Sequence, residues 1–353
     1  MGHVGVPRGR KGASRVARKR ERNWKMREAF WALAMTLLFV PSAYPAPVYH
    51  VSRPAWYSSL GEETDRERSG LTGLVRTVTI WKAGFSPGGK MRVETPRQIL
   101  RETCYDVHGN MTERTSYGPG GSVSSRHEYV YDPEGRKVRL LIHRADGSLN
   151  STWIYRYDES GALTGWGKYG SDGSLIQTVS HTYHAAGWMT ERAVRGPEGG
   201  LEWKHVYTYD AAGDLIEDIR YKGDGSLLSR YRYTYHSNGN KTGSEYARYD
   251  RSGSIEWRHV FRYDGKGIVI REFEYEADGS LNTESDYTHE FDSAGNWIRQ
   301  IKWIYLSGSG KRRFTPFVVT YRTVTYYPEE TDGEEGDQER RGAPDKGKRH
   351  MKQ

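Results

Sequence analysis

Cysteine is almost absent from this chain of 353 residues, which contains only Cys104. A single thiol cannot form an internal disulfide, so an exported form of the protein must be stable without one. Long apolar runs are also lacking. The apolar run Ala29–Val40 holds twelve residues, whereas a membrane-spanning helix needs about 20. No stretch after Val40 shows a sustained helical period, which argues against a helical protein.

The formal net charge of +8 is concentrated at the N-terminus. Residues 1–45 contain ten Lys or Arg and two Glu, so the rest of the chain is close to neutral. A basic flank, a short apolar core and small residues after it are typical of a secretory signal peptide. We therefore expect residues 1–46 to be a leader, with Met26 as an alternative start. An uncleaved signal anchor, a buried helix and a basic nucleic-acid-binding arm are the alternatives.

Export is the expected consequence of such a leader. The protein would then reach the periplasm, the cell surface or the extracellular medium, without an integral membrane span once the leader is removed. We expect no nucleic-acid partner, because the apolar core directly behind the basic run suits export better. Residues 47–69 are predicted to be an irregular leader. Residues 328–353 have no aromatic and almost no apolar side chains, which predicts a disordered charged tail.

Aromatic residues return at a fixed interval along the middle of the chain. The first six are 26 residues apart and the last two follow at steps of 28: Tyr105, Tyr131, Tyr157, Tyr183, Tyr209, Tyr235, Tyr263 and Phe291. A glycine stands four residues after each of them. A fixed period of this size indicates one supersecondary unit that is copied along the chain.

Each unit is predicted to contain two strands and two turns. In residues 209–234, stretches that alternate between apolar and polar side chains are separated by turn signals such as Asp224-Gly225. The connections are too short for parallel crossovers, so neighbouring strands must be antiparallel. We therefore predict an all-β fold in which tandem repeats of 26–28 residues form one long twisted or curled antiparallel β-meander. It would span residues 70–327, with atypical end caps. The sequence does not decide whether this sheet closes on itself.

The turn after each aromatic residue defines the repeat. Asp at the first corner bonds back to the backbone, and Gly adopts the positive φ that ends the turn. The residues that define these turns include Asp132, Gly135, Asp158, Gly161, Asp210, Gly213, Asp264 and Gly267. A calcium loop gathers several oxygen ligands within a dozen residues, whereas each unit here offers one or two. We predict no metal and no cofactor.

Both repeat lengths are even, so equivalent side chains are expected on the same face of every strand. This predicts a ribbon of stacked rings. Its candidate binding residues are Trp153, Tyr155, Trp203, Tyr207, Tyr231, Tyr233, Trp257 and Phe261. Either these rings form the core, or they are exposed and stack on sugars. If the sheet curls with the rings inward, Arg and Lys on the other face should pair with carboxylates. The carboxylates expected there are Glu217, Asp218, Glu245, Glu272 and Glu274.

The repeated Tyr-Asp-x-x-Gly motif resembles the YD repeat, also called the RHS repeat. Matching motifs begin at Tyr105, Tyr131, Tyr157, Tyr209 and Tyr263, so the resemblance covers about residues 100–300. It implies an exported or surface-associated protein built from long antiparallel sheets. Some members of the family enclose a toxin and others act in adhesion. This chain has a longer period, no RHS core region and no folded toxin domain, and about eight units are expected to be too few for a closed shell.

Catalytic motifs are missing from the repeats. No HExxH or Gly-x-Ser-x-Gly pattern occurs, and His181, His205 and His259 occupy equivalent positions that suggest repeated packing. We do not expect an enzyme. We expect an exported binding module for a polysaccharide or another cell-envelope component. The alternatives are a structural spacer or an orphan fragment of an RHS-type toxin-delivery system, and a glycan hydrolase, whose paired carboxylates need closeness only in space.

Overall fold

The computed structural model describes residues 64–86, 92–235, 241–306 and 313–328. All of them belong to one compact unit. The predicted signal peptide, the alternative start, most of the leader 47–69 and nearly all of the charged tail lie outside the described residues. Those boundaries remain predictions.

The described residues contain 18 strands and very little helix. In chain order the strands are β1 (Val75–Gly84), β2 (Gln98–Tyr105), β3 (Met111–Tyr117), β4 (Val123–Tyr131), β5 (Lys137–Arg144), β6 (Leu149–Tyr157), β7 (Leu163–Gly170), β8 (Leu175–Tyr183), β9 (Met189–Arg195), β10 (Leu201–Tyr209), β11 (Leu215–Lys222), β12 (Leu227–Tyr235), β13 (Lys241–Tyr249), β14 (Ile255–Tyr263), β15 (Val269–Glu276), β16 (Leu281–Phe291), β17 (Trp297–Leu306) and β18 (Arg313–Tyr326). The helical elements are α2 (Asp65–Arg68) and the 3-10 turn η1 (Pro119–Gly121). Among these residues, no helix has the length and apolar character that crossing a membrane requires.

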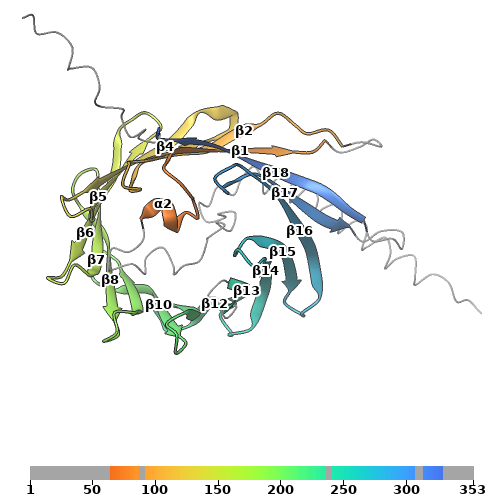
Figure 1. Ribbon diagram of the computed structural model, residues 1–353. Helices are drawn as coiled ribbons and strands as arrows, with labels where there is room; N and C mark the ends of the chain where they lie inside the picture. The colour runs from red at the N-terminus through yellow and green to blue at the C-terminus, as the bar shows by residue number, and fades with distance from the viewer. Residues whose placement is uncertain (1–63, 87–91, 236–240, 307–312, 329–353) are drawn as a thin grey trace, which may run out of the picture. The chain divides into compact units, whose positions relative to one another are not determined.

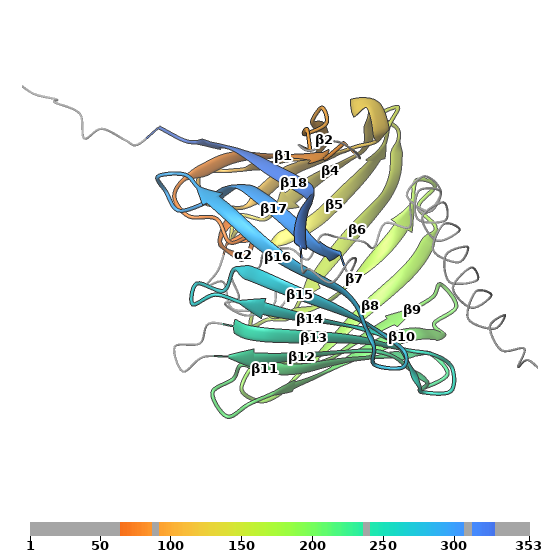
Figure 2. The same cartoon turned by 90° about the vertical axis from the view of Figure 1, so that its right-hand side faces the viewer.

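The strands form one closed antiparallel barrel, which confirms the predicted all-β meander. Each strand pairs with the next in the chain, and β1 pairs with both β2 and β18, so the sheet has no free edge. Figure 1 shows the strands following one another around a ring, and Figure 2 shows β11 to β16 side by side in chain order. Closure satisfies the backbone groups that the two end strands would otherwise expose.

The turns between strands have the same geometry in successive units, which explains why the repeat length is nearly constant. In the turn after β4, the Gly135 amide donates to the Asp132 carbonyl at 3.0 Å, and Gly135 has a φ of 77°. The register then shifts by one residue where Tyr131 faces Lys137. A type I turn followed by a left-handed glycine and a bulge is a common hairpin connection, and it requires glycine at that position. The same arrangement recurs at the other end of the unit, where the Gly147 amide donates to Arg144.

The periodic tyrosines fasten consecutive units together. Five of their hydroxyls donate to a backbone carbonyl 20 residues earlier, at 2.7–2.8 Å: Tyr131 to Met111, Tyr157 to Lys137, Tyr183 to Leu163, Tyr209 to Met189 and Tyr235 to Leu215. Each such bond contributes about 0.5–1.5 kcal/mol. Tyr263, which ends a longer unit, instead shares its hydroxyl with Ser244 Oγ at 2.8 Å. The tyrosine period therefore reflects a repeated structural bond.

Helix α2 identifies the inward face of the barrel. Figure 1 shows α2 inside the ring of strands, where Asp65 accepts a hydrogen bond from the Tyr131 hydroxyl at 2.6 Å and lies 3.3 Å from Lys137 Nζ. Burial alone would raise the pKa of Asp65, but Lys137, Arg68 and the Tyr131 hydroxyl lower it further than burial raises it. The carboxylate of Asp65 thus holds α2 against β4 and β5.

Candidate functional site

All eight predicted ring residues lie on the inward face. They share that face with Tyr131 through the register of the paired strands. Tyr207 is buried, with 5% of its surface exposed, and the other seven are partly exposed. The rings therefore do not form a groove on the outside of the sheet. They line the interior of the barrel, where some of their surface remains accessible.

Further aromatic side chains, together with apolar residues packed between them, join these rings into a continuous surface. Trp153 stacks on Trp166 with a centroid distance of 4.4 Å, and Tyr231 stacks on Tyr246 at 4.1 Å. The Tyr246 ring meets Trp257 edge-on at 5.0 Å. Trp166 and Tyr246 were missed in the sequence because they lie on the first strand of their units, whereas the periodic tyrosine ends the second. We call the inward aromatic surface of β6 to β14 the ring wall.

A cluster of charged residues, here called the arginine centre, lies within the ring wall on β9, β10 and β11. It consists of Arg192, Trp203, His205, Asp218 and Arg220. His205 is the register partner of both arginines, so the three side chains form a row across the sheet. The His205 ring nitrogen Nδ1 lies 2.6 Å from a carboxylate oxygen of Asp218. The carbons Cζ of Arg220 and Arg192 lie 4.2 Å and 5.5 Å from the Trp203 ring centroid.

The two guanidinium groups of this centre have few partners. Neither forms a hydrogen bond or an ion pair with a described residue, and the Nε of each is buried and unpaired. Burial lowers the pKa of both groups, but arginine remains charged at neutral pH. Among the described residues, the carboxylate of Asp218 is the one acidic group that interacts electrostatically with both guanidiniums, and it already bonds to His205. The centre carries excess positive charge.

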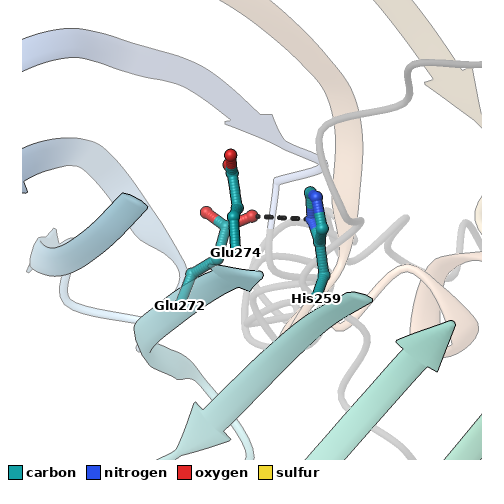
Figure 3. A group of neighbouring side chains, drawn as sticks. All are labelled: His259, Glu272 and Glu274. Atoms are coloured by element: carbon teal, nitrogen blue, oxygen red, sulfur yellow. Dashed lines mark ion pairs between the residues drawn. The ribbon is translucent and has the colours of Figure 1, made fainter. Parts of the chain in front are cut away.

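A second cluster, here called the acidic centre, lies on β14 to β17. Figure 3 shows His259, Glu272 and Glu274 pointing toward one another from neighbouring strands, with His259 Nδ1 3.3 Å from Glu272 Oε1. Lys302 Nζ lies 2.6 Å from Glu272 and 3.9 Å from Glu274, and the Tyr287 hydroxyl donates to Glu272 at 2.6 Å. Burial would raise the pKa of Glu272, but its bonds to His259, Lys302 and Tyr287 lower it to about 2.

The acidic centre has the donor types of a metal site. One ligand atom from each of His259, Glu272 and Glu274 lies within 4.8 Å of the others, although no spacing in the sequence suggested it. The ammonium group of Lys302 already occupies the position of a counter-cation beside both carboxylates. A divalent cation would have to displace this group, so we assign no metal to the cluster. The prediction of no cofactor remains a prediction.

The two centres occupy equivalent positions two units apart. His205, Asp218 and Arg220 correspond to His259, Glu272 and Glu274, each 54 residues further along the chain. The equivalence of the histidines was visible in the sequence and was interpreted as packing. Their acidic partners were not found, because pairing across strands depends on a register that the bulges shift.

The expected pairing of the carboxylates is wrong for three of the five. Asp218, Glu272 and Glu274 face inward, since adjacent residues such as Glu217 and Asp218 point to opposite faces of a strand. Glu217 and Glu245 do face outward and pair with arginines. The outward ion pairs are Arg126–Glu113 at 2.8 Å, Lys204–Glu191 at 2.8 Å, Arg232–Glu217 at 3.2 Å and Arg258–Glu245 at 3.4 Å.

The predicted turn residues serve their own turns. Asp158 accepts hydrogen bonds from the amides of Ser160 and Ala162, both at 3.0 Å, and Asp132 pairs with Arg136 at 2.7 Å. Asp210 and Asp264 accept amide bonds in the same way. The four glycines have a positive φ: Gly135 77°, Gly161 83°, Gly213 87° and Gly267 78°. These carboxylates are used locally, so they do not converge on a shared ligand.

Comparison with known proteins does not identify the chain. No protein family model matches it, and no curated protein matches its sequence. Solved structures with some similarity include a porin-like protein from Bacteroides uniformis, at 9% identity and a TM-score of 0.39, covering 72% of this chain and 99% of that one.

Two further similar structures contain toxin components. The Photorhabdus luminescens Tc holotoxin pore is 13% identical with a TM-score of 0.27, covering 64% of this chain but 15% of that one. The TcdB2-TccC3-Cdc42 structure is 12% identical with a TM-score of 0.16, covering 70% and 20%. These similarities are too low to transfer a function, and the YD-type resemblance remains a prediction from the repeat motifs.

Proposed function

We propose that the protein is an exported barrel that binds a polysaccharide or another polymer of the cell envelope along its ring wall. The observation that supports this most directly is the ring wall itself, a continuous aromatic surface that keeps part of its area accessible on the inward face. Flat rings beside hydrogen-bonding groups favour ligands with alternating apolar and polar surfaces, and sugar chains have both.

The outward face supports a barrel that works in water. Membrane barrels present an apolar band to lipid, and a charged side chain at the bilayer midplane costs about 2–4 kcal/mol. Here the outward face of β9 to β15 carries charged pairs such as Lys204–Glu191 and Arg258–Glu245. Together with the predicted leader, this favours the periplasm, the cell surface or the medium, without an integral membrane span.

Binding is tested on the full chain expressed with its own leader. The exported protein is titrated with neutral and charged polysaccharides and incubated with envelope fractions. We expect at least one polysaccharide to bind, and Tyr231→Ala to weaken it at least tenfold by removing a ring of the wall. Ile154→Ala, an exposed outward position beside Trp153, is the matched control and should bind normally. Retention of the protein inside the cell, or no binding to any fraction, would contradict the proposal.

A glycan hydrolase is the second candidate, because Glu272 and Glu274 lie close together on the inward face. Their separation is compatible with a pair of catalytic carboxylates, but one of the two must carry a proton at working pH. Glu272 cannot be that acid, because its pKa is about 2, so Glu274 would have to donate the proton. The oxygens of Glu272 are already engaged by His259, Tyr287 and Lys302, which places them poorly for attack on a sugar, and we therefore favour binding without turnover. Release of reducing ends from a bound polysaccharide, abolished by Glu274→Gln, would reverse this preference.

A further inference from the structure

The arginine centre is the part of the ring wall whose charge is least compensated. The outward arginines described above each pair with a carboxylate, for example Arg232 with Glu217 at 3.2 Å. Arg192 and Arg220 instead lie on either side of His205 without a carboxylate of their own. Each also repels the other through space, since Arg192 contributes to lowering the pKa of Arg220. Such an arrangement is costly on a half-buried surface unless an anion joins it.

The geometry holds both guanidiniums at the inward surface. Trp203 lies beside both groups, at 4.2 Å from Arg220 and 5.5 Å from Arg192, and Trp166 adds a second ring at 5.9 Å from Arg192. Cation–π contacts fix the position of each fork without using its hydrogen-bond donors. Trp203 is therefore a positioning residue, and the outer nitrogens of the two forks remain without an acceptor among the described residues.

The acidic centre gives the ring wall a charge gradient, because its charge is opposite to that of the arginine centre. At the position equivalent to Arg220 stands Glu274, and at the position equivalent to Arg192 stands Tyr246. An anionic group is attracted to the arginine centre and repelled by Glu272 and Glu274 on the same inward surface. A charged polymer would consequently have one preferred placement along the ring wall.

We propose that Arg192 and Arg220 form an oxyanion-binding subsite, and that the polymer held by the ring wall is an anionic polysaccharide. Paired guanidinium forks bind the oxygens of a carboxylate, sulfate or phosphate group by charge-assisted hydrogen bonds. Neighbouring rings such as Tyr231 contact the sugar to which that group is attached. This inference rests on the proposed function, because it names the class of polymer that the same surface binds.

The test uses the full chain and three polymers that differ in charge: polygalacturonate, its fully methyl-esterified form, and dextran sulfate. We expect polygalacturonate to bind at least tenfold more tightly than the ester, with affinity that falls as salt increases. The double variant Arg192→Gln/Arg220→Gln should lose at least tenfold in affinity for polygalacturonate and keep its affinity for the ester. Tighter binding of dextran sulfate than of polygalacturonate would identify sulfate as the preferred anion.

Controls separate binding from folding. Arg232→Gln removes an outward arginine on β12, three strands from Arg192 and one from Arg220, and should leave every affinity unchanged. The double variant loses two mutually repelling charges, so its melting temperature should be equal to or higher than that of the unmodified protein. Polygalacturonate should raise the melting temperature of the unmodified protein but not that of the double variant.

The outcomes distinguish the two proposals. Equal binding of polygalacturonate and its ester, unchanged in the double variant, would overturn the anionic subsite while leaving polysaccharide binding intact. Failure of all polymers and envelope fractions to bind would overturn both. An affinity loss in Arg232→Gln equal to that of the double variant would show a general effect of positive charge and would also overturn the subsite.

Discussion

The arginine centre and the acidic centre are built on the same repeat but carry opposite charge. Both have a histidine that contacts a carboxylate on the next strand, His205 with Asp218 at 2.6 Å and His259 with Glu272 at 3.3 Å. Two positions then set their charge apart, Arg220 against Glu274 and Arg192 against Tyr246. In the acidic centre Lys302 lies beside both carboxylates and balances one of their two charges, whereas neither arginine of the arginine centre has a carboxylate partner of its own among the described residues.

Opposite charge on the same backbone shows how a repeat protein can separate its scaffold from its binding site. The periodic tyrosines and the turns keep the backbone the same in every unit, so the inward positions can change without changing the fold. A compensated cluster contributes to stability, and an uncompensated one costs stability that a ligand can recover. The predictions below test whether the two centres divide in this way.

The largest effect is expected from Lys302→Met in the acidic centre. The substitution leaves Glu272 and Glu274 on the inward face without their ammonium partner. The side chain of Glu272 is only 7% exposed, so water cannot replace that partner fully. Removing one partner of a buried ion pair costs about 3–5 kcal/mol. The free energy of unfolding measured with urea should fall by that amount. Lys204→Met breaks the outward pair with Glu191 and should cost at most about 1 kcal/mol. Equal losses would show that the acidic centre is not a compensated cluster.

Acid should weaken the acidic centre through Glu272. The pKa of this carboxyl is about 2 in the folded protein and 4.5 ordinarily, so the folded state holds its proton less tightly than the unfolded chain does. Its stabilisation is present above pH 4.5 and is lost as pH falls toward 2, with a total of about 3 kcal/mol. Glu272→Gln should flatten the stability profile in that window, as followed by thermal melts. Glu217→Gln on the outward face is the control, and an identical flattening there would contradict the assignment.

A smaller effect is expected from Lys241. Together with Lys137 it gives a second comparison between a paired and an unpaired charge, here with one lysine in each case. Lys137 and Lys241 occupy equivalent positions beside Tyr129 and Tyr233, but Lys137 pairs with Asp65, whereas Lys241 forms no ion pair with a described residue. Burial lowers the pKa of Lys241 from 10.5 to about 7. The folded state therefore loses its proton first, and stability should rise as pH increases from 7 to 10.5.

The shift in the pKa of Lys241 corresponds to about 4 kcal/mol at pH 7, and the loss of the ammonium contacts with the Tyr233 and Tyr263 rings offsets part of it. Lys241→Met should accordingly stabilise the protein by about 1–2 kcal/mol near pH 7, and this gain should disappear toward pH 10.5. Lys137→Met should destabilise it, because Asp65 would lose its partner. Urea unfolding at pH 7 and pH 10 measures both. A destabilised Lys241→Met variant at pH 7 would mean that the charge of Lys241 is compensated.

Much of the architecture was predictable because it depends on local chemistry. Glycine ends the turns and aspartate begins most of those that follow the periodic aromatic residues, and the even period places Trp153, Tyr207 and Phe261 on one face in three different units. The same parity separates Glu217 from Asp218, yet the two were grouped together in the prediction. That error came from composition, whereas strand geometry alone would have assigned them to opposite faces.

The strands, their antiparallel order and the shared face of the rings were predictable from the amino-acid sequence, because those features follow from neighbouring residues and a repeated length. The three-dimensional structure was needed to show that β1 pairs with β18, that Asp65 contacts Lys137, and that Arg192, His205 and Arg220 form one row. These contacts depend on curvature summed over 18 strands and on a register that each bulge shifts. The curvature of each strand and the register shift at each bulge are small, so the sequence contains no pattern that predicts which distant charged residues come into contact.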